Sequence, residues 1–220
     1  MVIGFTGGFV RRNDMVHGPV QLAERLRRDL PAGTYIGVFD NWHGEQAHAE
    51  ILRRLDAAHP GRPSPAEKQN ARIILYGHSW GATQAIVLAR ELQRDGVPVL
   101  LAVQVDSVAK PGQNDFLIPA NVAAAANFYQ TTGALHGQSA IRAADPVRTQ
   151  ILGNYKFDYA AHPVGCYAPY PWYDRFFMKA HTEIECDPDV WEQVETLIRS
   201  RLPERGTFNE DDHGEGSSAR

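Results

Sequence analysis

A short glycine-bounded turn between two apolar segments constrains the fold of this chain more than any other feature. The turn, Gly77-His78-Ser79-Trp80-Gly81, follows directly on the apolar run Ile73-Ile74-Leu75-Tyr76. After the turn, apolar residues recur at helical spacing, at Ala82, Ala85, Ile86, Ala89 and Leu92. The pattern predicts a buried strand that enters a sharp turn and continues as an amphipathic helix.

The turn has the form G-x-S-x-G, which is typical of a nucleophile elbow, and we call residues 77–81 the elbow. In a strand-to-helix turn of this form, small residues on both sides let the backbone pass close by and lift the serine hydroxyl above the sheet. A serine hydroxyl is a weak nucleophile without a base to take its proton and donors for an oxyanion. A simpler interpretation is a βα turn in which glycine allows close packing and Ser79 caps the helix. Because that interpretation leaves the residues discussed below unexplained, we expect Ser79 to be a nucleophile.

Strands and helices alternate through the first half of the chain. Apolar runs and helical periodicity predict strands over residues 2–6, 34–39, 72–76 and 97–105, and helices over 19–30, 46–58 and after the elbow. Such alternation predicts an α/β fold, a three-layer αβα sandwich with a mostly parallel sheet. The active site of such a fold lies at the carboxyl ends of the strands.

The second half of the chain is less regular. Residues 121–130 contain alanines that suit a helix, but their position after a proline-bounded loop favours a fifth strand. Residues 131–180 are expected to be mostly loops, and a final helix is expected after Asp187, with Pro188 in its first turn. The polar composition from Pro203 onward predicts a disordered tail over 203–220, after a single domain over 1–202.

Composition limits the class of protein. A chain of 220 residues with 43% hydrophobic residues is long enough for one well-buried domain. Its net charge of -4, without a basic stripe, argues against nucleic acid as a partner. No stretch approaches the roughly 18 apolar residues of a transmembrane segment, and the N-terminus opens into Val2-Ile3-Gly4-Phe5 without the basic and apolar regions of a leader. We therefore expect a cytoplasmic protein, or a secreted one if a leader has been removed. The sequence leaves the oligomeric state open.

The two cysteines, Cys166 and Cys186, lie on either side of His181. They could form a disulfide that braces the histidine segment in an oxidising compartment, or they could be ordinary thiols. We expect reduced thiols. A zinc site needs more ligands than this spacing offers, so we expect neither a metal nor a cofactor.

The order of serine, acid and histidine on alternating βα units resembles the α/β-hydrolase superfamily, over nearly everything up to residue 202. The chain lacks the first two strands common in that family, and in this compactness it is similar to cutinases and other small lipases. The resemblance implies a lipase-like serine esterase with a catalytic triad.

The resemblance implies His181 as the catalytic base, because it lies just before the final helix, where the family's histidine lies. We expect it in a loop. Among the nine histidines, His78 adjoins the serine and should point away from it. His136 and His162 remain weaker alternatives, whereas four others precede the serine, which the family order disfavours: His17, His43, His48 and His59.

The acid is harder to choose. Asp106 follows the apolar run 97–105 and should emerge at the carboxyl end of the strand beside the elbow strand, as in pancreatic-type lipases. Many other family members carry the acid one strand later, which would indicate Asp145 or, less well, Asp158. We favour Asp106, whose other possible role is to cap the turn before Lys110.

The oxyanion hole is expected to use the backbone N–H of Trp80 and one N–H from the loop after the first strand. In Thr6-Gly7-Gly8-Phe9 that donor is Gly8 or Phe9. The family often has His-Gly at this point, and Thr6-Gly7 departs from that pattern.

An aromatic run near the histidine either lines a substrate pocket or belongs to the core, and we assign its members Trp172, Phe176 and Phe177 to substrate binding. The whole pattern predicts a serine hydrolase that cleaves a small-molecule ester or thioester through an acyl-enzyme. The alternatives are a hydrolase-fold binding or scaffold protein without activity and an acyltransferase that uses the same triad.

Overall fold

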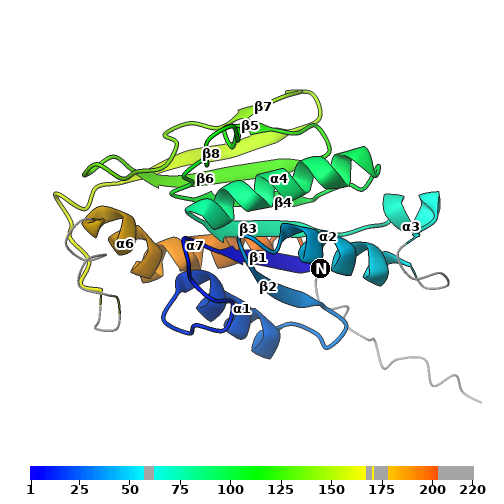
Figure 1. Ribbon diagram of the computed structural model, residues 1–220, viewed down its shortest axis with the longest axis horizontal. Helices are drawn as coiled ribbons and strands as arrows, with labels where there is room; N and C mark the ends of the chain where they lie inside the picture. Colours follow the sequence, from blue (N-terminus) through cyan, green and yellow to red (C-terminus); the bar gives the residue numbers. More distant parts are fainter. Residues whose placement is uncertain (57–61, 167–169, 171–177, 203–220) are drawn as a thin grey trace, which may run out of the picture.

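The computed structural model describes residues 1–56, 62–166, 170 and 178–202. Its centre is a six-stranded sheet with the order β2-β1-β3-β4-β6-β8 (Figure 1), in which every neighbouring pair is parallel. The strands are β1 (Val2–Thr6), β2 (Ile36–Asp40), β3 (Ile74–His78), β4 (Leu101–Val105), β6 (Ala124–Gln130) and β8 (Gln150–Phe157). The predicted parallel sheet is therefore confirmed.

Helices cover both faces of this sheet. One face packs against α1 (Gly18–Asp29), α6 (Lys179–Cys186) and α7 (Pro188–Arg199). The other face packs against α2 (Gly44–Leu55) and α4 (Trp80–Arg94), which lie in front of the sheet in Figure 1. The helix α3 (Pro65–Gln69) is short, and β5 (Leu117–Ile118) pairs with β7 (Arg142–Ala143) in a separate two-stranded sheet. The predicted three-layer sandwich is confirmed.

Alternating side chains of the central strands divide the core into two halves. In β3, Tyr76 points into the half that contains α1 and α7, whereas Leu75 points into the half that contains α4. A Cβ atom on Gly4 would overlap the ring of Tyr76, so glycine in β1 makes room for this ring. The Tyr76 hydroxyl donates a hydrogen bond of 2.9 Å to the carbonyl oxygen of Pro19. The contact fixes the start of α1 against the sheet.

The strand order reverses at β1, which lies between β2 and β3. The helix α1 follows β1 on one face and leads to β2. The helix α2 follows β2 on the other face, and the chain then continues to β3. In open α/β sheets, such a reversal opens a crevice at the carboxyl ends of the strands. The loop after β1 and the elbow after β3 therefore face each other across this crevice.

The second half of the chain contains both a confirmed and a missed strand. The expected strand over 121–130 is confirmed as β6. In contrast, β8 lies in the segment expected to consist of loops. It is an edge strand whose side chains are exposed or half-buried, so its sequence lacks a continuous apolar run. The expected tail over 203–220 lies outside the described residues.

Candidate active site

The turn between β3 and α4 holds Ser79 in a conformation that few residues other than glycine adopt. Its φ is 56° and its ψ is -127°, which is the kind of strained backbone found at functional sites. A Cβ atom on Gly77 would overlap the backbone of Gly81, and one on Gly81 would overlap the carbonyl oxygens of Phe5 and Thr6. Both glycines of the motif are therefore required by close backbone contact.

Ser79, His181 and Asp106 form a continuous chain of hydrogen bonds. The Nε2 atom of His181 lies 2.9 Å from the hydroxyl oxygen of Ser79. The Nδ1 atom of His181 lies 2.7 Å from Oδ2 of Asp106. All three side chains are buried. The structure thus brings together the three residues that the sequence singled out, although they are as much as 102 positions apart.

Asp106 lies just after β4, with a φ of 43°. Its carboxylate accepts hydrogen bonds from the N–H of Gly137, at 2.7 Å, and from Nε2 of Gln130, at 2.8 Å. Burial alone would raise the pKa of Asp106, but the hydrogen bond and charge of His181, followed by Gln130 and Gly137, outweigh it and lower this pKa. The carboxylate is therefore held ionised beside the imidazole.

The alternative acids and bases lie elsewhere. The Oδ1 atom of Asp145 accepts a hydrogen bond from the N–H of Val147 in the turn before β8, and Oδ1 of Asp158 accepts two from the turn after it. His136 contacts the carbonyl oxygen of its neighbour in the loop, and His162 is exposed. None of these four residues takes part in the hydrogen-bonded chain at Ser79.

His181 lies on α6, not in a loop as expected. Burial lowers the pKa of its imidazole, and the charge of His78 lowers it further, against the opposing effect of Asp106. The neutral form is thereby favoured. The segment before the final helix thus forms a separate helix. It ends at Cys186, and α7 begins at Pro188.

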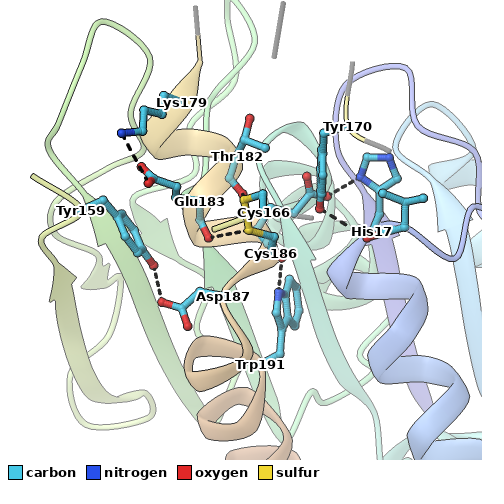
Figure 2. Close-up of a disulfide and its surroundings, with 12 residues drawn as sticks. His17, Tyr159, Cys166, Tyr170, Lys179, Thr182, Glu183, Cys186, Asp187 and Trp191 are labelled. Carbon is cyan, nitrogen blue, oxygen red and sulfur yellow. Dashed lines mark hydrogen bonds and ion pairs between the residues drawn. A yellow bond between two sulfur atoms is a disulfide. The ribbon is translucent and has the colours of Figure 1, made fainter. Parts of the chain in front are cut away.

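The expectation of reduced thiols is wrong, because Cys166 and Cys186 form a disulfide (Figure 2). Their Cα atoms are 5.7 Å apart, since the segment after β8 returns alongside α6. Below the disulfide in Figure 2, Asp187 accepts a hydrogen bond from the Tyr159 hydroxyl, and Trp191 donates one to the carbonyl oxygen of Glu185. The end of the helix that carries His181 is thus fixed by a covalent bond and by side chains.

The loop after β1 is held by two residues that the sequence did not single out. The side-chain amide of Asn41 donates a hydrogen bond of 2.5 Å to the carbonyl oxygen of Gly8, whose φ is 42°. The ammonium group of Lys110 in turn donates to Oδ1 of Asn41, at 2.7 Å, and lies 5.1 Å from the centre of the Trp80 ring. Asn41 is buried directly after β2, a strand-end position that could have indicated its role.

These contacts determine which way the peptide after Gly8 faces. Asn41 follows β2 and Ser79 follows β3, on opposite sides of β1. The carbonyl of Gly8 points toward Asn41, and a trans peptide places the N–H of Phe9 on the opposite side of that peptide. No described residue accepts a hydrogen bond from the N–H of Phe9 or of Trp80. Both residues line the same cavity as Ser79.

A cavity of about 600 Å³ opens above Ser79. Its mostly apolar wall includes Phe9, Trp80, Val108, Leu135, Tyr170 and Met178. The predicted substrate-binding residues Trp172, Phe176 and Phe177 lie outside the described residues. Their assignment therefore stays a prediction. The described residues on either side of this segment, Tyr170 and Met178, both line the cavity.

The described residues contain neither a metal-binding group nor a membrane-spanning helix. In the described part of the chain, no three His, Cys, Asp or Glu side chains are arranged to hold a metal ion. None of the helices described has the length and apolar character needed to span a bilayer.

The fold is an α/β-hydrolase-like three-layer sandwich. No protein-family model matches the chain, and no curated protein matches it. Among solved structures, the chain is similar to a cutinase-like protein from Cryptococcus sp., at 15% identity and a TM-score of 0.43, over 91% of this chain and 93% of that chain.

Two further solved structures are similar to the chain. One is an α/β serine hydrolase without a lid from Xanthomonas campestris, at 15% identity and a TM-score of 0.39, over 93% of this chain and 84% of that one. The other is a thioesterase of the prodiginine biosynthetic pathway from Streptomyces coelicolor, at 13% identity and a TM-score of 0.34, over 83% and 89%.

Proposed function

We propose that the protein is a serine hydrolase that cleaves a carboxylic ester or thioester through an acyl-enzyme. The observation that carries this proposal is the chain of hydrogen bonds from Ser79 through His181 to Asp106, at the base of an apolar cavity. A nucleophile, a base and an acid that orients the base are the minimum that acyl transfer to serine needs.

In the proposed mechanism, the Ser79 hydroxyl attacks the substrate carbonyl as Nε2 of His181 takes its proton. Asp106 accepts a hydrogen bond from Nδ1 of His181, which fixes the tautomer and stabilises the imidazolium ion without taking the proton. The imidazolium then protonates the leaving alcohol or thiol. A water molecule repeats the sequence on the acyl-enzyme, releases the acid and restores Ser79. These steps need no cofactor.

The oxyanion of each tetrahedral intermediate would be bound by the N–H groups of Trp80 and Phe9. The direction of the Gly8 carbonyl toward Asn41 supports Phe9 over Gly8 as the second donor. Donors of this kind lower the barrier most when they are held in place before the reaction. Asn41 and Lys110 would be positioning residues for this hole, because they hold its loop and do not touch the substrate.

The apolar lining of the cavity supports an uncharged acyl group as the part of the substrate next to Ser79. The ring of Phe9 is 86% exposed and lies edge-on to that of Trp80, with 5.7 Å between the ring centres. Together these two rings would form one wall of the entrance. The disulfide favours an oxidising compartment over the cytoplasm expected from the sequence.

Hydrolysis of a panel of p-nitrophenyl esters and acyl-coenzyme A thioesters tests the proposal. Wild type is expected to hydrolyse at least one of them, and Ser79→Ala to lose that turnover while keeping its circular dichroism spectrum. Ser200→Ala is the matched control, because Ser200 ends α7 away from the cavity. Turnover retained by Ser79→Ala would rule the mechanism out. No turnover by folded wild type would favour the binding protein instead.

A further inference from the structure

The segment that follows β4 begins with the triad acid and touches two other parts of the site. We call residues 106–115 the acid loop. It contains no helix or strand, so contacts of its side chains must fix its shape. Within it, Val108 lines the cavity, and Lys110 donates a hydrogen bond to Asn41. The position of this loop therefore affects the acid, the cavity wall and the support of the loop after β1.

Three buried polar side chains, which the mechanism above does not use, close the acid loop. We call Thr83, Ser107 and Asp115 the hydroxyl clasp. The Ser107 hydroxyl donates a hydrogen bond of 2.7 Å to Oδ2 of Asp115, which joins the two ends of the loop. The Oγ1 atom of Thr83 lies 3.1 Å from Oγ of Ser107 and 3.2 Å from Oδ2 of Asp115. Each of the three residues is at most 1% exposed.

Thr83 attaches the clasp to the turn of α4 that follows the nucleophile. Its N–H donates a hydrogen bond of 3.3 Å to the carbonyl oxygen of Ser79. Its hydroxyl donates one of 2.8 Å to the carbonyl oxygen of Val108, and the N–H of Val108 donates one of 3.4 Å to the carbonyl oxygen of Ser79. The acid loop is thus bound to the same turn that carries the serine.

Asp115 is held through both its side chain and its backbone. Its carbonyl oxygen accepts a hydrogen bond of 3.0 Å from Nε2 of Gln104, a fully buried residue of β4. Among the described residues, Oδ1 of Asp115 has no hydrogen-bond partner. Burial of a polar atom without a partner costs free energy, and an apolar side chain would fill the same space without that cost. The carboxyl group therefore serves the position of the groups that its other oxygen binds.

The contacts continue from the acid loop to the loop after β1. Lys110 lies between the two ends that the clasp joins, and its ammonium group donates to Oδ1 of Asn41 at 2.7 Å. The side-chain amide of Asn41 in turn holds the carbonyl oxygen of Gly8. Closure of the acid loop therefore limits where Asp106, at its start, and Lys110, in its middle, can lie.

We propose that Asp115 is a positioning residue of the hydrolase, which closes the acid loop against α4 and thereby holds Asp106 and Lys110 in place. This inference rests on the proposed function. Asp115 is fully buried and is not among the described residues that line the cavity, so it acts through the loop and does not touch the substrate. A displacement of about 1 Å at the reacting groups can cost about a hundredfold in rate.

Steady-state hydrolysis of a p-nitrophenyl ester tests the inference in two variants that break the clasp. Asp115→Leu removes the acceptor, and Thr83→Val removes a hydroxyl while it keeps the shape of the side chain. In both variants kcat is expected to fall about tenfold to a hundredfold, with KM little changed. Asp115→Asn and Thr83→Ser keep the hydrogen-bonding atoms and should restore most of the lost kcat. If Asp115→Leu does not fold, Thr83→Val still gives the result.

The matched control for Thr83→Val is Thr149→Val. It removes a buried hydroxyl that contacts the carbonyl oxygen of Pro119 outside the cavity, and it should keep the wild-type kcat. Folded Thr83→Val that also keeps the wild-type kcat would overturn the inference, even if its resistance to denaturant is lower. The clasp would then stabilise the fold only.

A double-mutant cycle tests the step through Lys110. If the clasp supports the loop after β1 through Lys110 and Asn41, Asn41→Ala should lower kcat by a smaller factor in Thr83→Val than in wild type, because part of that support is already lost. Equal factors in the two backgrounds would show that the clasp does not act through Lys110, and this part of the inference would be wrong.

A signal that does not depend on turnover keeps this inference distinct from the proposed function. The proton on Nδ1 of His181, which faces Asp106, is followed by NMR in protein isotopically labelled at histidine, with His181→Gln used for assignment. A resonance that is shifted or broadened in Thr83→Val, and unchanged in Thr149→Val, supports the role of the clasp even if no ester is hydrolysed. A wild-type resonance in Thr83→Val contradicts that role even if the protein is an active esterase.

Discussion

The two sides of the hydrogen-bonded triad are built in different ways. Ser79 and Asp106 follow adjacent strands of the sheet, and both have positive φ values. His181 lies on a helix whose end is fixed by a disulfide and by side chains from distant parts of the chain. The strand-end side thus depends on local backbone geometry, whereas the histidine side depends on tertiary contacts. The first kind of geometry leaves a signature in the sequence and the second does not.

Removal of the Asp106 charge should give the largest effect, on the strand-end side. Asp106→Asn keeps the shape of the side chain but leaves the His181 tautomer unsupported, so kcat should fall about 10⁴-fold. Steady-state ester hydrolysis measures this, with Asp145→Asn as the control that keeps wild-type kcat. Equal losses in the two variants would mean that Asp106 is not the acid.

The glycine contacts at the elbow are the next target. In Gly81→Ala the new methyl group overlaps the carbonyl oxygens of Phe5 and Thr6, so the free energy of unfolding should fall by about 3 kcal/mol. Chemical denaturation measures the loss. Gly165→Ala is the control, because a Cβ atom there has no neighbour within 4 Å. Similar stability of both variants would show that β1 and α4 are not packed as described.

The disulfide offers the corresponding test of the histidine side. A variant with both Cys166→Ala and Cys186→Ala opens a covalent loop of 20 residues and should lower the free energy of unfolding by about 3 kcal/mol. Denaturation with and without a reducing agent measures this, since reductant should destabilise wild type and leave the double variant unchanged. If reductant has no effect on wild type, the thiols are not paired.

The smallest of these effects is expected at the loop after β1. Asn41→Ala releases the carbonyl of Gly8 and lets the N–H of Phe9 turn away, so kcat should fall about tenfold to a hundredfold with KM little changed. Asn13→Ala, an exposed change near the same loop, is the control for the kinetic measurement. A fall in kcat/KM that comes from KM alone would indicate that Asn41 acts on substrate binding.

The same contrast explains how far the sequence predicts the structure. Apolar runs followed by glycine or aspartate predicted β1, β3 and β4 and the proximity of Ser79 and Asp106, because buried parallel strands need such runs. The half-exposed edge strand β8 has no such run. The pairing of Cys166 with Cys186 depends on how the segment after β8 returns to α6, and spacing in the sequence does not show that.

Polar residues that support the site were missed for a related reason. Asn41 and Gln130 lie at or just after strand ends, where a polar side chain has several ordinary roles. Their partners, the carbonyl of Gly8 and the carboxylate of Asp106, become visible only when the strand order is known. Strand order is a property of the sheet and not of any one segment.

The most direct test of the central claim is covalent labelling with a fluorophosphonate, followed by mass spectrometry of the intact protein and its peptides. An activated serine attacks the phosphorus and keeps the label, whereas an ordinary hydroxyl does not react. We expect one label per wild-type chain, on the peptide that contains Ser79, and none on Ser79→Ala. Folded wild type that stays unlabelled, or Ser79→Ala that is labelled to the same extent, would contradict it.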